Sequence, residues 1–239
     1  MTIAMILAAG RGKRMQPLSN SCPKPLLEVA GKPLIVWQIE ALARANFKKI
    51  IINHAWLGSQ IETILGDGKR YGVEIIYSRE GVAKETAGAI AYARHLLKDS
   101  KDSIFLATSA DIYTHYDYSR LHQIILKMQY SSLYKMHLVL VPNPTYHQLG
   151  DFSLAHGKIT WDTDKRLTFA NIGIYHLSLF EKINAGETVA MNCIFRDCIQ
   201  AGYAYGEYFD GLWCNIGSPE QLENINQHWQ KPPQLAKKT

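Results

Sequence analysis

The 239-residue sequence lacks the features of a membrane-spanning, exported or repeat protein. No run of apolar residues reaches the roughly 20 that a helix needs to cross a bilayer, and no basic segment precedes the apolar residues near Met1. We therefore expect no membrane partner and no signal peptide. Internal repeats and low-complexity linkers are also missing, so we expect a single cytoplasmic domain without an appended β-helix.

Cysteine and clustered charge are equally scarce. The four cysteines show no C-x-x-C spacing, which favours reduced thiols over disulfides or a zinc site. The net charge of +5 is spread over the predicted helices and turns, apart from one loop and the Lys237-Lys238 tail, so we expect no nucleic-acid partner. None of the nine histidines belongs to a recognisable Ser/His/Asp arrangement. The sequence does not indicate whether the protein is a monomer or a dimer.

Glycine and positive charge are concentrated instead in the loop after the first predicted strand. Gly10 and Gly12 let the backbone approach a ligand, so that successive N–H groups can converge on phosphate oxygens. Lys24 follows in a Pro-Lys-Pro segment, whose stiffness reduces the entropy lost when the lysine binds phosphate. The loop predicts a triphosphate site with backbone or cationic contacts from Ala8, Ala9, Gly10, Arg11, Gly12, Lys13 and Arg14.

Two other glycine-rich loops fit this segment less well. The dinucleotide fingerprint G-x-G-x-x-G requires glycine at position 15, where this chain has Met15. A Walker A loop requires Ser or Thr after Gly12-Lys13, and Arg14 would deprive Mg²⁺ of its hydroxyl ligand. A plain glycine turn with solvated cations is the remaining alternative, and the stiff segment around Lys24 weighs against it.

Strand-like runs alternate with helical patterns through the first 140 residues, which predicts an α/β fold: a Rossmann-like mixed, mostly parallel sheet with helices on both faces. We expect strands at 3–7, 48–53, 73–77, 103–108 and 137–141, and helices at 33–45, 57–65, 86–97 and 117–129. We further expect short strands at 151–161 and 167–176, a helix at 188–201 and a last helix from Pro219. The single domain would comprise a nucleotide-binding part (1–140), a sugar-binding part (141–230) lying over the sheet edge, and a disordered tail (231–239).

Asp111 follows the strand predicted at 103–108. Ligands of open α/β sheets bind at the carboxyl ends of the strands, and Mg²⁺ commonly takes one or two protein carboxylates together with substrate phosphates. Asp111 is therefore a candidate Mg²⁺ ligand, and a turn or capping aspartate is the structural alternative.

In several motifs the chain resembles the sugar-1-phosphate nucleotidyltransferases. The resemblance rests on G-x-G-x-R-M, the Pro-Lys-Pro segment and the Gly31-Lys-Pro-Leu34 segment, with further blocks at 53–58, 85–90, 110–113, 150–152 and 213–218. It implies a GT-A-like fold and attack of a sugar 1-phosphate on the α-phosphorus of a nucleoside triphosphate. The Asn-His-Ala-Trp-Leu-Gly block at 53–58 resembles a uridylyltransferase branch, which implies UTP, N-acetylmuramate 1-phosphate and a role in cell-wall recycling.

The resemblance also implies roles for individual residues. Arg14, Lys24 and Asp111 would be catalytic, and Asp111 and Asn215 would bind Mg²⁺. The nucleobase would meet backbone groups around Ala8, Ala9 and Gly10 and the turn at 85–88, with Glu85 and Gly88, that opens the third helix. The sugar would meet Gly150, Asp151 and Asn171.

Several positions depart from the family pattern. Asn215 replaces an aspartate, Asn171 and Ala110 replace glycines, and Ala87 and Ala89 flank Gly88 where the uridylyltransferase branch has three glycines. Loss of a carboxylate at 215 would weaken metal binding. A weakened, regulatory relative that binds nucleotide or sugar phosphate, or a cytidylyltransferase acting on choline phosphate, therefore stays open.

Overall fold

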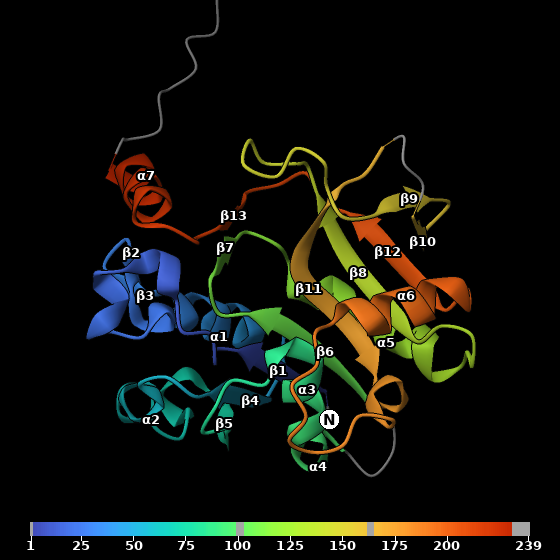
Figure 1. Cartoon of the computed structure of the whole chain (residues 1–239), viewed down its shortest axis with the longest axis horizontal. Coiled ribbons are helices and arrows are strands. Elements are labelled where there is room, and N and C mark those ends of the chain that lie inside the picture. The colour runs from blue at the N-terminus through green and yellow to red at the C-terminus, as the bar shows by residue number, and fades with distance from the viewer. Residues whose placement is uncertain (1, 99–102, 162–164, 231–239) are drawn as a thin grey trace, which may run out of the picture.

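The computed structural model describes residues 2–98, 103–161 and 165–230, and within them a nine-stranded sheet carries helices on both faces (Figure 1). The strand order is β5-β4-β1-β6-β11-β8-β12-β10-β9. The bounds are β1 Ile3–Leu7, β4 Lys49–His54, β5 Glu74–Arg79, β6 Ile104–Ser109, β8 Met136–Val141, β9 Ser153–Ala155, β10 Lys158–Thr160, β11 Thr168–His176 and β12 Ala204–Tyr208. Of these strands, β10 and β11 run opposite to the other seven, so the sheet is mixed and mostly parallel as predicted.

Two short strand pairs lie outside this sheet. They are β2 Glu28–Val29 with β3 Lys32–Pro33, and β7 Ile112–Thr114 with β13 Trp213–Asn215. The helices are α1 Leu34–Arg44, α2 Gly58–Leu65, α3 Glu85–Tyr92, α4 Arg94–Leu97, α5 Leu121–Gln129, α6 Asn192–Gln200 and α7 Pro219–Gln230.

The first half of the chain folds as its patterning predicts. The parallel register places Leu7 of β1 beside Asn53 of β4 on one side and Ser109 of β6 on the other. Gly66 ends α2 with φ of 63°, and the Ser119 N–H donates to Asp117 Oδ1 at 2.9 Å ahead of α5. The helix predicted at 86–97 divides at Ala93 into α3 and α4.

The second half differs from its predicted place over the sheet edge. β11 lies inside the sheet, antiparallel to β6 on one side and to β8 on the other, and β12 extends the sheet from β8. The side chains of β11 explain this position, because Ile172 and Ile174 are fully buried on one face and Tyr175 is buried on the other. A strand that is apolar on both faces is stable inside a sheet rather than over it.

Two hydrophobic cores lie on opposite faces of the sheet. One is built with α1, α2 and α5, and the other with α3, α4 and α6. A third, smaller core joins α7 to the two short strand pairs through Val29, Tyr113 and Ile225.

Among the described residues no helix has the length and apolar character needed to span a membrane. The tail predicted at 231–239 lies outside the described residues.

Candidate functional site

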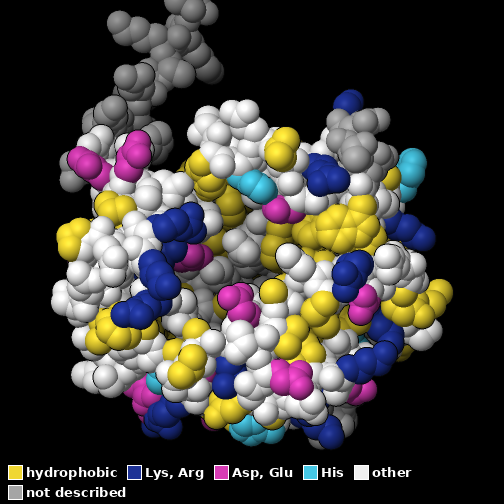
Figure 2. All heavy atoms as spheres, in the orientation of Figure 1, with side chains coloured by type: hydrophobic (Ala, Val, Ile, Leu, Met, Phe, Trp, Pro, Cys, Tyr) yellow, Lys and Arg dark blue, Asp and Glu magenta, His cyan; other side chains and the backbone are white. Residues whose placement is uncertain are grey.

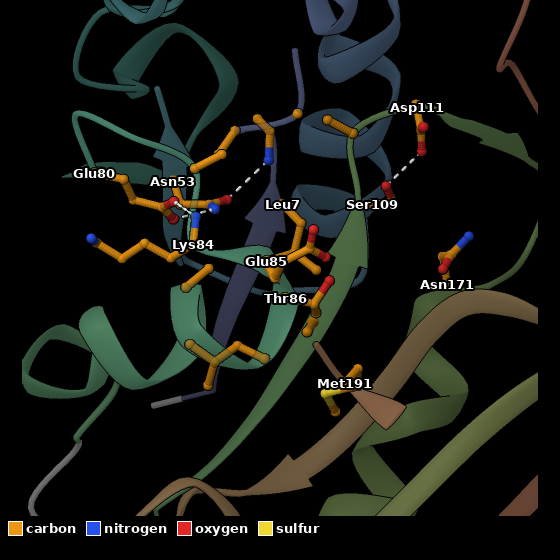
Figure 3. A pocket seen from close by; sticks show the side chains of 18 of the residues that line it. Leu7, Asn53, Glu80, Lys84, Glu85, Thr86, Ser109, Asp111, Asn171 and Met191 are labelled. Carbon is orange, nitrogen blue, oxygen red and sulfur yellow. Dashed lines mark hydrogen bonds between the residues drawn. The ribbon is translucent and has the colours of Figure 1, made fainter. Parts of the chain in front are cut away.

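The carboxyl ends of β1, β4, β5 and β6 surround a cavity of about 350 Å³. The predicted site residues that line it are Ala8, Ala9, Gly10, Lys24, Glu85, Asp111 and Asn171. Figure 3 shows that Asn53 with Glu80 and Ser109 with Asp111 lie on either side of β1. The parallel register explains this gathering, because residues that follow neighbouring strands emerge at one edge.

The loop after β1 is fixed by contacts around Gly12. Its φ of 63° is a left-handed conformation that favours glycine, and a Cβ at this position would lie 3.2 Å from the Cβ of Lys24. The Gly12 carbonyl accepts hydrogen bonds from the Met15 N–H at 2.8 Å and from the Ser19 hydroxyl at 2.8 Å. Gly12 therefore holds the cationic loop against the Lys24 segment.

Lys24 and Asp111 meet at the edge of the first cavity. The Lys24 ammonium forms an ion pair with Asp111 Oδ2, and the Ser109 hydroxyl donates to Asp111 Oδ1 at 2.5 Å. The Lys24 side chain is 11% exposed and that of Asp111 is 26% exposed. The stiff Pro-Lys-Pro segment thus delivers a nearly buried cation to the carboxylate that follows β6.

The other cations of the loop take three different positions. The Arg11 guanidinium lies 4.7 Å from the ring centroid of Trp56, whose indole N–H donates to the Ser19 carbonyl at 3.1 Å. Lys13 is exposed. Arg14 lies against Gly217 and lines a second cavity. Of these three, Arg14 is the one that lines a cavity together with other predicted site residues.

A hydrogen-bonded chain forms the opposite wall of the first cavity. The Ala8 N–H donates to Asn53 Oδ1 at 2.9 Å, Asn53 Nδ2 donates to Glu80 Oε1 at 2.6 Å, and the Lys84 N–H donates to Glu80 Oε2 at 3.0 Å. Burial raises the pKa of the Glu80 carboxyl, and the hydrogen bonds from Asn53 and Lys84 oppose that rise. The Ala8 N–H, predicted to meet the nucleobase, is thus already committed to Asn53.

The predicted turn at 85–88 opens α3, as expected, but its residues face different ways. Glu85 has φ of 60° and lines the cavity. Gly88 faces a neighbouring segment, where its N–H donates to the Val189 carbonyl at 3.0 Å and a Cβ would lie 2.3 Å from the Glu187 carbonyl oxygen. The absence of a side chain at Gly88 therefore allows α3 to pack closely against the backbone at Glu187 and Val189.

A second cavity of about 980 Å³ adjoins the first. Phe169, Asn171 and Phe195 line both. The predicted site residues that line the second cavity are Arg14, Gly150, Asp151, Asn171 and Asn215. Figure 2 shows a hollow in this face of the molecule, with dark-blue lysine and arginine side chains gathered along one side.

Asp151 organises the wall of the second cavity. Its Oδ2 accepts from the Phe169 N–H at 2.8 Å, and its Oδ1 lies 3.0 Å from His147 Nε2. Gly150 has φ of 63°, and a Cβ there would lie 2.8 Å from the Arg166 carbonyl carbon. Gly150 and Asp151 therefore fix the backbone that faces the cavity.

Asn171 and Asn215 are placed by irregular or short strands. Asn171 has φ of 57° at the point where the register of β11 against β8 shifts. Asn215 of β13 pairs with Ile112 of β7, and the Ile216 N–H donates to the Asp111 carbonyl at 2.9 Å. The backbone thus joins Asn215 to the segment that carries Asp111.

The donor set at this edge suits a divalent cation shared with a substrate. Asn215 Oδ1 is buried and accepts no hydrogen bond among the described residues, and Asp111 carries a carboxylate on the segment that is joined to β13 through backbone hydrogen bonding. Within the same residues no group of three or more His, Cys, Asp or Glu could hold a metal alone. The set fits Mg²⁺, which takes a few protein oxygens and completes its shell with phosphates.

Sequence reasoning missed other residues that line the two cavities. Asn53 and Glu80 stand at the ends of predicted strands, so the same rule that selected Asp111 could have found them. Tyr146, Arg166 and Arg196 line the second cavity without any local motif.

Comparison with known proteins places this geometry among nucleotidyl transferases. The family model described as "Nucleotidyl transferase" matches residues 3–150. The chain is 42% identical over 224 residues to N-acetylmuramate alpha-1-phosphate uridylyltransferase of Neisseria meningitidis serogroup B, covering 92% of this chain and 95% of that protein. It is 29% identical to the mannose-1-phosphate guanylyltransferase catalytic subunit beta of Drosophila melanogaster, covering 92% of this chain but only 61% of that longer protein.

Solved structures share the fold at low sequence identity. A Bacillus anthracis protein assigned as a glucose-1-phosphate thymidylyltransferase, in complex with sucrose, matches with a TM-score of 0.84 and 17% identity, over 97% of this chain and 96% of that one. HddC from Yersinia pseudotuberculosis in complex with GMP-PN matches with a TM-score of 0.76 and 18% identity, over 96% of this chain and 100% of that one.

Proposed function

Because the chain belongs to the nucleotidyl transferase family, whose members transfer a nucleoside monophosphate from a triphosphate to a sugar 1-phosphate, we propose that it uses UTP and N-acetylmuramate 1-phosphate. The products would be UDP-N-acetylmuramate and pyrophosphate. The proposal includes a role in cell-wall recycling or surface polysaccharide synthesis, and a cytoplasmic reaction, where nucleoside triphosphates are supplied.

One observation carries the choice of substrates. The uridylyltransferase of Neisseria meningitidis matches this chain at 42% identity over nearly the full length of both proteins. The two adjoining cavities support a reaction of this class, because a reaction between a nucleotide and a sugar phosphate needs two sites that meet at the reacting phosphorus.

In the proposed reaction, an oxygen of the sugar phosphate attacks the α-phosphorus of UTP. A new phosphorus–oxygen bond forms while the bond from the α-phosphorus to the bridging oxygen breaks, and that oxygen leaves with pyrophosphate. The attacking phosphate is already ionised at neutral pH, so the reaction needs no general base. The work of the protein is therefore to position the substrates and to neutralise charge.

The residues of this chain suit those tasks. Lys24, held by its stiff segment, would bind the α-phosphate and stabilise the charge that builds there in the transition state. Lys13 and Arg14 would bind the β- and γ-phosphates. Asn171, which lines both cavities, would contact the sugar close to the reacting centre.

The family generally uses a divalent metal ion, and we propose Mg²⁺, held by Asp111 and Asn215. When bound, it would neutralise phosphate charge between the two substrates. Asn215 supplies a neutral amide oxygen, so this part of the site holds one negative charge where the family pattern has two.

A pyrophosphate-release screen tests the proposal. Purified protein and Mg²⁺ would be given ATP, CTP, GTP, UTP or dTTP, each with the 1-phosphate of N-acetylmuramate, glucose, N-acetylglucosamine or mannose, or with choline phosphate. We expect turnover with UTP and N-acetylmuramate 1-phosphate. Turnover with another pair would replace these substrates, and triphosphate binding without turnover would favour the regulatory alternative.

A further inference from the structure

One side of the second cavity is formed by a cluster of four aromatic rings. Phe152 packs against Trp161 and Phe195 with ring centroids 5.1 Å apart in each pair, and Phe169 packs against Phe195 at 5.5 Å. All four rings line the cavity. Such a wall accommodates methyl groups and the apolar face of a sugar ring.

A cation lies on the side of this cavity formed by α6. Asn192, Arg196 and Gln200 are spaced four residues apart, so they share one face of α6, and all three line the cavity. The Arg196 side chain is 61% exposed. Its Nε lies 3.6 Å from Asp197 Oδ1, an exposed and loose pair that leaves most of the guanidinium edge available to a ligand.

Arg196 and Arg14 belong to different parts of the site. Arg14 lies against Gly217, close in sequence to Asn215, and so belongs to the side where Asp111 and Lys24 meet. Arg196 projects from α6, on another side of the cavity, so an anion bound by Arg196 would differ from the phosphates proposed for Arg14. The carboxylate of Asp151, which also lines the cavity, is already taken by His147 and the Phe169 N–H.

We propose that Arg196 binds a carboxylate carried by the sugar itself, on the part of the ring away from the 1-phosphate. The inference rests on the proposed function. N-acetylmuramate differs from N-acetylglucosamine by a lactyl ether at C3, which adds one carboxylate and one methyl group. Arginine pairs with carboxylates through two parallel hydrogen bonds, and the aromatic wall receives the methyl groups. Arg196 is thus a specificity residue that selects acidic sugars.

A double cycle tests the pairing of these two groups. The wild-type protein and Arg196→Gln would each be assayed with N-acetylmuramate 1-phosphate and with its lactyl methyl ester, which removes the negative charge and adds one methyl group. We expect the wild type to favour the acid over the ester by about 10- to 100-fold in kcat/KM, because charged hydrogen bonds have this magnitude. We expect the difference to lie mainly in KM, and Arg196→Gln to lose the preference.

Lys182→Gln is the matched control. It removes one positive charge from an exposed position outside both cavities, and the preference for the acid should persist. A wild type that treats acid and ester alike overturns the inference even if no variant can be purified. A preference that survives in Arg196→Gln also overturns it. Absence of any turnover with N-acetylmuramate 1-phosphate would instead show that the proposed function itself has failed.

Discussion

The ammonium group of Lys24 and the carboxylate of Asp111 form an ion pair although 87 positions separate them in the sequence. The pair links the loop after β1 to the segment after β6, at the edge of the first cavity. Each partner restrains the other before any substrate arrives. In the proposed reaction a triphosphate would therefore meet a cation and a carboxylate that are already in place, which would lower the entropic cost of reaching the transition state.

Replacing Lys24 by alanine tests the role of this cation. Lys24→Ala should lower kcat by at least about 100-fold, the loss typical of removing one preorganised group that stabilises transition-state charge. Single-turnover pyrophosphate release would measure it. Lys69→Ala is the control, because its ion pair with Asp67 is exposed and should contribute little to stability or rate. Turnover of Lys24→Ala within tenfold of wild type would contradict the assignment.

Restoring a carboxylate at position 215 should strengthen metal binding. Asn215→Asp places a negative charge where a buried, unpartnered amide oxygen now stands. We expect the Mg²⁺ concentration for half-maximal rate to fall, as measured by titrating the metal at saturating substrates. Gln129→Glu adds the same charge on an exposed part of α5 and should leave the titration unchanged. An unaltered Mg²⁺ requirement in Asn215→Asp would show that this position does not limit the site.

Replacement by alanine should affect substrate binding at Gly10 and folding stability at Gly88. A Cβ on Gly10 meets no atom within 4 Å, so Gly10→Ala should fold normally but raise KM for the triphosphate, since the methyl group enters the space of the ligand. A Cβ on Gly88 would lie 2.3 Å from the Glu187 carbonyl oxygen, so Gly88→Ala should lower the free energy of unfolding by about 1–3 kcal/mol. Urea denaturation and nucleotide kinetics on both variants distinguish these effects. Loss of stability in Gly10→Ala would contradict the first expectation.

The Glu80 carboxyl gives a defined pH dependence. Burial raises its pKa in the folded protein above the ordinary value of 4.5. As pH rises from 4.5 to the folded pKa, the folded protein keeps a proton that the unfolded chain has lost. The contribution of Glu80 to stability therefore falls through that window and is constant above it.

Glu80→Gln removes this titration and keeps one of the two oxygens that accept hydrogen bonds from Asn53 and Lys84. Wild type should thus lose stability relative to Glu80→Gln as pH rises from 4.5. Urea denaturation of both proteins between pH 4 and pH 7 would measure the difference. A difference that is constant, or that favours wild type as pH rises, would refute the expectation.

Asn171 combines an uncommon backbone conformation with a place in both cavities. Asn171→Val should lower the free energy of unfolding by about 1–3 kcal/mol, because a β-branched residue is strained at φ of 57°. Asn171→Gly should retain stability but raise KM for the sugar phosphate, because the amide is lost from the cavity. Thermal unfolding together with sugar-phosphate kinetics separates the two variants, and equal KM values in wild type and Asn171→Gly would rule out a sugar contact.

The part of the site nearest the N-terminus could be predicted because its signals are local. Gly12 must adopt a left-handed conformation, Lys24 is stiffened by flanking prolines, and Asp111 follows a buried strand. Each of these features can be recognised from a few consecutive residues. The parallel register of β1, β4 and β6 then brings them together. The alternation of strands and helices predicted that the sheet would be mostly parallel, but not this register.

The remaining features depend on pairings between distant segments. The antiparallel β11 lies between β6 and β8, and no local pattern in 167–176 predicts which strands it pairs with. β7 and β13 are three residues long, too short for periodicity to reveal. Arg196 faces the second cavity because α6 packs over the sheet, a tertiary contact that composition does not encode.

Because β11 lies between β6 and β8, the sheet can be completed only after β11 has been synthesised. Chains emerge from the ribosome N-terminus first, so β6 and β8 are made before the strand that joins them. Until about residue 176 has emerged, both strands present unpaired edges that can pair with other chains. The Asn215 side of the site follows later still. A nascent chain that carries the whole loop after β1 therefore has no assembled candidate site. Truncation before β11 should yield an aggregating fragment rather than a nucleotide-binding one.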